Sequence, residues 1–213
     1  YYSNTIPVVS GATVYIKNSV NTVFDFIEIP NTGEYVCTNF IPQIDEIYTL
    51  TVVNNGETYT ATETLKSVAP IQSLEQKNDG GITGEDIEVR TYFNDPVLEE
   101  NYHMFKFKYS NLVKLNYYVD EDRFYNGNTF FSVTDNDDLS AGDTVEITHY
   151  GISRSYYNYM NVLLSVAGNN GGGPFQSPPA TVRGNIVNQT NFDNYALGFF
   201  RLSEVDTRYY VIQ

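Results

Sequence analysis

Apolar and polar side chains alternate along most of this 213-residue chain, which is the pattern of half-buried β-strands. In the first third, the alternation predicts strands near residues 12–17, 23–29, 48–52 and 58–65. The sequence Asn54-Asn55-Gly56 separates the last two runs and predicts a tight hairpin, because such turns need positive φ angles. Turn signals about every ten residues predict a small immunoglobulin- or transthyretin-like β-sandwich.

The segment Lys66–Pro70 interrupts the alternation, and we place a domain boundary there. We expect residues 1–68 to form the small sandwich and residues 69–213 to form a larger β-sandwich. In this second domain the alternation predicts strands at 87–93, 105–109, 112–119, 129–133, 144–150, 196–202 and 208–212.

One segment of the second domain departs from the β pattern. Residues 153–167 carry apolar side chains at helical spacing, which predicts one amphipathic helix laid on a sheet. Ser153 or Ser155 can cap its start, and Gly168 can end it in the left-handed conformation. The predicted fold class is therefore all-β, with two tandem β-sandwich domains, the second carrying one helix.

A glycine- and proline-rich loop, residues 168–180, follows this helix. Gly171–Gly173 is flexible, whereas the prolines that follow stiffen the chain and remove backbone donors. Long loops inside compact domains are either functional or disordered. The large apolar side chain of this loop is Phe175. It either docks on the sheet or contacts a partner, and we favour docking.

Composition narrows the function classes. The chain has 19 Tyr, 13 Phe and no Trp, which is typical of β-proteins. With 26 acidic and 12 basic residues its net charge is −14, so we expect no nucleic-acid partner and no electrostatic docking on an anionic membrane. No apolar run is long enough to span a bilayer, and the single cysteine excludes an intrachain disulfide.

The strongest metal candidate is the acidic turn Asp135–Asp138 together with Glu146, since oxygen ligands fall at several calcium-loop positions. However, Leu139 and Ser140 occupy positions where such a loop needs a ligand and a glycine. A solvated acidic turn is the better interpretation, as it is for Asp120–Asp122. We predict no metal ion and no cofactor.

Catalytic candidates are equally weak. Glu99 or Glu100 could be half of a glycosidase pair, but the sequence does not place a second carboxylate. His103 and His149 are the only histidines and lie 46 residues apart in two predicted strands. The chain has no Gly-x-Ser-x-Gly motif. We predict no catalytic residue and no enzymatic activity.

Five aromatic side chains are the candidate ligand or partner surface: Tyr117, Tyr118, Tyr157, Tyr159 and Phe175. Tyrosine is large, rigid and half-polar, which suits interfaces and sugar stacking. The competing interpretation is that helix tyrosines pack on the sheet or rim it, and we favour it. The absence of tryptophan weakens a glycan-binding interpretation.

Several short motifs occur in order along nearly the whole chain and carry a family resemblance. They are Val9–Val14, Gly33–Val36, Tyr48–Val52, Tyr59–Thr62, Asp95-Pro96, Asn101-Tyr102, Gly142–Val145, Tyr156–Tyr159, Gly173–Phe175, Pro178-Pro179 and Ala196–Phe200. Together they resemble the DUF4249 family, predicted lipoproteins of Bacteroidetes. The resemblance implies a signal peptide, a lipidated cysteine, an outer-membrane location and often a neighbouring gene for a TonB-dependent transporter. It implies no reaction.

The leading hypothesis is therefore a non-enzymatic surface lipoprotein that binds a ligand or partner, as an accessory to a TonB-dependent transporter. The alternative is a free-standing glycan-binding module or adhesin. The chain starts at Tyr1-Tyr2-Ser3 without an initiator methionine, so we expect any lipid anchor to lie upstream of it.

Overall fold

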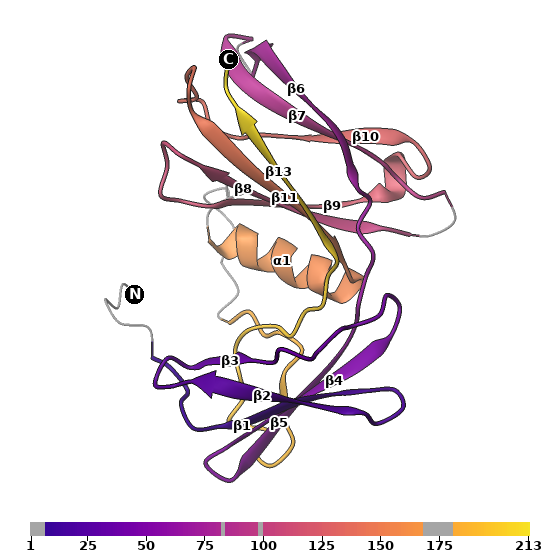
Figure 1. Cartoon of the computed structure of the whole chain (residues 1–213), viewed down its shortest axis with the longest axis vertical. Coiled ribbons are helices and arrows are strands. Elements are labelled where there is room, and N and C mark those ends of the chain that lie inside the picture. The colour runs from indigo at the N-terminus through magenta and orange to yellow at the C-terminus, as the bar shows by residue number, and fades with distance from the viewer. Residues whose placement is uncertain (1–6, 82–83, 98–99, 168–180) are drawn as a thin grey trace. The chain divides into compact units, whose positions relative to one another are not determined.

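The computed structural model describes residues 7–81, 84–97, 100–167 and 181–213, and it divides the chain into two compact units (Figure 1). The first unit comprises Tyr1–Leu65 and Ala180–Leu202, and the second comprises Lys66–Pro179 and Ser203–Gln213. The predominance of strands, with one α-helix in the described part of the chain, confirms the all-β class. The late segment Ala180–Leu202, which we had assigned to the second domain, belongs to the first unit.

Antiparallel strands form one six-stranded sheet in the first unit, in the order β12-β5-β4-β1-β2-β3. Their bounds are β1 (Thr13–Asn18), β2 (Val23–Ile29), β3 (Glu34–Val36), β4 (Ile47–Asn54), β5 (Glu57–Thr64) and β12 (Val187–Asn188). The predicted hairpin joins β4 to β5, with φ of 50° at Asn55 and 80° at Gly56. Asparagine and glycine tolerate this left-handed backbone better than other residues.

The core of the first unit lies on one face of this sheet. Ile16 and Tyr48 are almost fully buried there, and Phe40 packs its ring edge against Tyr48 at 5.2 Å between centroids. Phe200 and Leu202 of the late segment complete the same cluster. The small core of the first unit therefore depends on residues more than 130 positions away in sequence.

The late segment also differs from the prediction in its local structure. Residues 196–202 were expected to form a strand, yet they have no regular secondary structure. The side chain of Asn185 accepts a hydrogen bond from the Phe200 amide at 2.8 Å and donates one to its carbonyl at 2.9 Å. The Asn185 side chain therefore takes the place of a strand neighbour for Phe200, and residues 196–202 cover the sheet, whereas β12 of the same segment extends it.

Two facing sheets form the second unit. The first has the order β10-β7-β6, and the second has the order β13-β11-β8-β9. The bounds are β6 (Ile71–Gly80), β7 (Asp86–Asn94), β8 (Tyr102–Tyr109), β9 (Asn116–Glu121), η1 (Asp122–Phe124), β10 (Thr129–Val133), β11 (Thr144–Ile152) and β13 (Val205–Val211). The predicted strand at 112–119 starts later than expected, at Asn116.

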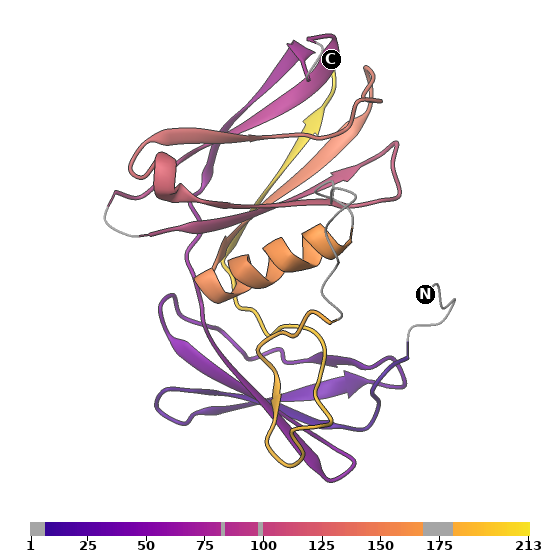
Figure 2. The same ribbon diagram turned by 180° about the vertical axis from the view of Figure 1, so that it is seen from behind.

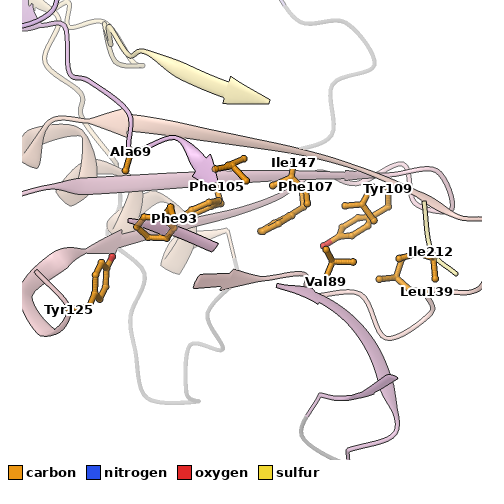
Figure 3. Packing of buried hydrophobic residues seen from close by; sticks show 12 residues of the cluster. Ala69, Val89, Phe93, Phe105, Phe107, Tyr109, Tyr125, Leu139, Ile147 and Ile212 are labelled. Carbon is orange, nitrogen blue, oxygen red and sulfur yellow. The ribbon is translucent and has the colours of Figure 1, made fainter. Parts of the chain in front are cut away.

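An aromatic core fills the space between these two sheets, and Figure 3 shows several of its side chains. Phe93 of β7 lies against Phe105 of β8, with ring centroids 5.6 Å apart. Val145 and Ile147 of β11 are completely buried in the same cluster. Side chains of opposite parity on β8 and β11, such as Met104, point to the other face of the four-stranded sheet.

The predicted helix packs on that other face, as both views show (Figures 1 and 2). It is α1 (Arg154–Val166), and the hydroxyl of Ser153 accepts a hydrogen bond from the Tyr156 amide at its start. Met160 and Leu164 are its buried residues, one turn apart. No helix in the described part of the chain is long and apolar enough to cross a membrane.

Candidate functional site

The structure does not bring the expected aromatic residues together on one surface. Tyr117, Tyr157 and Tyr159 are half-buried and pack in the cluster between α1 and the four-stranded sheet. Tyr118 is the next residue along β9 and points to the opposite face, into the core between the two sheets. Phe175 and its loop lie outside the described residues.

Tyr118 connects the acidic turn Asp135–Asp138 with the aromatic core. Its ring lies 5.9 Å from Phe107 in an edge contact, and its hydroxyl lies near the carboxylate of Asp135. Burial, reinforced by that carboxylate, raises the pKa of Tyr118 far above the ordinary tyrosine value. The Asp135 amide in turn donates to the hydroxyl of Tyr109 at 3.1 Å. The turn therefore closes the end of the aromatic core.

Glu146, the last residue of the considered calcium loop, lies in β11 and faces two lysines instead of the turn. Its carboxylate is 3.5 Å from the ammonium of Lys106 and 3.8 Å from that of Lys108. Asp143 accepts hydrogen bonds from the Ser110 hydroxyl and the Ser140 amide. Within the described ranges, no three His, Cys, Asp or Glu side chains gather as a metal site would need.

The first unit contains a mostly apolar depression, which we call the first-unit groove. It lies on the sheet face that also carries the core, where the late segment crosses the ends of β1, β4 and β5. Its volume is about 460 Å³, within the range of small-molecule sites. Its lining residues are Val9, Ala12, Val14, Tyr35, Leu50, Val52, Asn54, Tyr59, Ile186, Ala196 and Leu197.

Pairing register explains why these side chains converge. Val14 lies directly opposite Val52, and Val52 lies directly opposite Tyr59, so all three point to the same face. The late segment contributes Leu197, which remains 65% exposed at the rim. Apolar side chains that a folded protein leaves open in a depression are candidates for contact with another molecule.

The two tyrosine hydroxyls that line the groove are already paired. The Tyr35 hydroxyl donates to the carbonyl of Val9 at 3.0 Å and accepts from the Ala12 amide at 2.9 Å. The Tyr59 hydroxyl donates to a carboxylate oxygen of Glu57 at 2.7 Å, and this bond raises the pKa of Tyr59. Recognition in the groove would therefore depend mainly on apolar contact and shape.

The second unit contains a buried network of three polar side chains, Asp95, His103 and His149, that sequence reasoning missed. His103 Nδ1 lies 3.0 Å from His149 Nε2, and His103 Nε2 lies 3.3 Å from a carboxylate oxygen of Asp95. All three side chains are almost completely buried. The other Asp95 oxygen accepts a hydrogen bond from the Gly127 amide at 2.9 Å. The network therefore links the end of β7 with β8, β11 and the loop after η1.

Aromatic rings enclose the His149 end of this network. The imidazole of His149 stacks on Phe105 at 4.1 Å and lies 4.9 Å from Phe93. Burial, and then the nearby His103, lower the pKa of His149 well below the ordinary histidine value. The nearby backbone of Ala69 opposes this shift of the His149 pKa but does not reverse it. His149 is therefore neutral in the folded protein.

Residue parity could have indicated this histidine pair. His103 has the same parity as Phe105 and Phe107 in β8, and His149 has the same parity as Val145 and Ile147 in β11. Both histidines therefore belong to inward-facing sets. The sequence does not give the register of β11 against β8. In this register Gly151 lies opposite His103, so His149 is the diagonal neighbour of His103.

Comparison with known proteins agrees with the resemblance of the short motifs. A domain of unknown function, DUF4249, matches residues 1–209, which covers both units and the late segment that returns to the first. A comparison with curated proteins finds no match. The chain therefore belongs to the DUF4249 family, whose function is unknown.

Proposed function

We propose that this protein is a non-enzymatic surface lipoprotein that binds a ligand or a protein partner at the outer membrane, as an accessory to a TonB-dependent transporter. Membership in the DUF4249 family supports the proposal, because the resemblance carries the expectation of a lipid anchor and a neighbouring transporter gene. The net charge of −14 favours a partner other than nucleic acid or an anionic lipid surface.

The first-unit groove is the single observation that carries a binding role. Its volume of about 460 Å³ and its mostly apolar lining would accommodate a small apolar ligand or a few apolar side chains of a partner. Because Tyr35 holds the segment at Val9 and Ala12 by two hydrogen bonds, this wall of the groove is preformed. A preformed surface loses little conformational entropy when it binds.

The test is co-purification of the lipidated protein from outer membranes, with every recovered membrane protein identified by mass spectrometry. The wild-type protein should recover a TonB-dependent transporter. A Leu197→Asp variant should lose it, because a charge at the groove rim would have to be desolvated on binding. Ile41→Asp is the matched control, since Ile41 is 81% exposed in the same unit and does not line the groove.

Two results would count against the proposal. If Leu197→Asp retained the transporter as well as the wild type did, the groove would not be the contact. If repeated trials retained soluble glycans and no membrane protein, the accessory role would fail and the glycan-binding alternative would replace it.

A further inference from the structure

The second unit contains a polar cavity that differs chemically from the first-unit groove. It has no part in the function proposed for that groove. It has a volume of about 510 Å³ and adjoins a smaller cavity of about 220 Å³. The two share Glu100, Tyr102 and Arg154 as lining residues. Glu121, Asp122, Arg123 and Asn126 complete the larger one. The cavity is therefore lined by charges of both signs.

Hydrogen bonds hold the frame of this cavity in place. Asp122 is 3% exposed, and its carboxylate accepts the Asn101 amide at 2.8 Å, while the Asp122 amide donates to the Asn101 carbonyl at 3.2 Å. This reciprocal pair fastens the start of η1 to the start of β8. Tyr102 pairs with Ile152 of β11, and its ring lies tilted against that of Tyr157 of α1, with centroids 5.2 Å apart. The walls thus come from elements with fixed mutual geometry.

Several charges that line the cavity have no ionic partner among the residues that the structure describes. In the described part of the chain, no salt bridge joins Arg123 or Arg154 to a carboxylate, and no side-chain hydrogen bond occupies Glu121. Glu100 accepts a long bond of 3.3 Å from the Tyr102 hydroxyl. Both signs therefore remain available to a ligand that fills the cavity.

Opposite charges act on one central hydroxyl. Burial raises the pKa of Tyr102, the positive charge of Arg154 opposes that shift, and Glu100 and Glu121 add to it. The guanidinium and the two carboxylates therefore lie within electrostatic range of the same atom. Arg154 is also the first residue of α1, where the backbone amides and the helix dipole favour an anionic group.

We propose that this cavity binds a small zwitterion that carries an ammonium and a carboxylate, such as a short peptide with free termini. The carboxylate of the ligand pairs with Arg154 at the start of α1, because guanidinium groups match carboxylates in a bidentate manner. The ammonium lies between Glu121 and Glu100. A neutral sugar would leave these charges unpaired, and a simple anion would meet the carboxylates, so neither fits both walls.

The experiment is isothermal titration of the full chain with L-alanyl-L-alanine, compared with its N-acetylated, C-amidated and doubly blocked forms. The free dipeptide should bind, and blocking either terminus should weaken binding about tenfold or more, the equivalent of about 1.4 kcal/mol. Arg154→Gln and Glu121→Gln should each weaken the free dipeptide. Arg154→Gln should also abolish the difference between the free and the C-amidated forms.

Lys108→Gln and Glu34→Gln are the matched controls, because each removes one charge at an exposed site away from the cavity and should leave binding unchanged. The melting temperature of every variant is measured as a check of folding, which should be intact because no salt bridge among the described residues involves Arg154 or Glu121. Equal binding of free and doubly blocked dipeptide would overturn the proposal. The proposal would also be overturned if the free dipeptide at about 10 mM gave no detectable binding, because its Kd would then be well above about 1 mM. Neither result bears on the transporter partner of the first-unit groove.

Discussion

Mild acidification should destabilise the second unit through His149, which is held neutral among aromatic rings. In the unfolded chain its imidazole takes up a proton near pH 6.5, whereas the buried imidazole does so only well below that pH. Between these two values the unfolded state binds more protons than the folded state. The free energy of unfolding therefore falls as the pH falls below about 6.5.

The loss of unfolding free energy can be calculated from the uptake of one proton by His149 in the unfolded state. One group that titrates only in the unfolded state contributes a slope of about 1.4 kcal/mol per pH unit. Lowering the pH from about 6.5 to about 5 should then remove about 2 kcal/mol, a large share of a typical stability of about 5–15 kcal/mol. The ionisable groups facing His149 are His103 from β8 and Asp206, its cross-strand neighbour on β13.

Asp120 works in the opposite direction. Burial raises the pKa of this carboxyl, so the folded state holds its proton at a pH where the unfolded state has lost it. Its contribution therefore grows as the pH falls toward the ordinary aspartate range. Because the wild type and a His149→Phe variant share Asp120, the difference between their pH dependences isolates the contribution of the histidine.

Urea unfolding followed by tyrosine fluorescence, repeated between about pH 7.5 and pH 5, measures the slope. Hydrogen exchange on peptides from β8 and β11 assigns the loss to the second unit. A His149→Phe variant keeps a ring against Phe105 but cannot titrate. It should lose about 1–3 kcal/mol at neutral pH, because His103 loses its partner, and its slope should be shallower by about 1.4 kcal/mol per pH unit. Equal slopes for the wild type and this variant would refute the reasoning.

Three further predictions concern local structure. Asn188→Ala should lower stability by about 2–3 kcal/mol, because its buried side chain bonds two backbone amides and one carbonyl of the late segment; thermal unfolding with exposed Gln189→Ala as the control tests this, and equal losses would contradict it. Ser153→Ala should cost about 1 kcal/mol through loss of the helix cap, and Ser153→Asp should restore most of it; no recovery would show that the cap is not the cause. Calcium or a chelator should leave the melting temperature unchanged, since Glu146 faces lysines; a shift worth about 2.7 kcal/mol, as a ligand at 100 times its Kd would give, would reveal a site.

The strand pattern and the helix were accessible from the sequence because both depend on short-range periodicity. The alternation around Tyr48–Val52 and the Asn55-Gly56 turn predicted the β4–β5 hairpin, which the register confirms. The spacing of Met160 and Leu164, with Ser153 before them, predicted α1 to within one residue at each end. Local side-chain chemistry is sufficient for such elements.

The late segment was not accessible in this way. The stretch ending in Phe200 has the aromatic and apolar character of a strand, but the side chain of Asn185 occupies its backbone groups. Its place in the first unit depends on packing of Phe200 and Leu202 against strands far away in sequence. Periodicity describes which face a side chain takes and says nothing about which distant sheet it covers.

The candidate sites show the same division. The groove wall at Val14 and Val52 follows from parity, but its closure by Leu197 depends on the returning segment. The pairing of His103 with His149 needs the register of β8 against β11, which parity alone leaves open. Sequence reasoning placed single residues on faces, and the structure placed the faces together.

The most direct test of the proposed function is site-specific photo-crosslinking of the lipidated protein in living cells. A photoreactive phenylalanine analogue replaces Leu197 at the groove rim or, as the control, the exposed Ile41 of the same unit. The proposal predicts a crosslinked TonB-dependent transporter, identified by mass spectrometry, from the Leu197 position and none from the Ile41 position. Crosslinks from both positions alike, or no transporter from Leu197, would contradict the role of the groove in binding that partner.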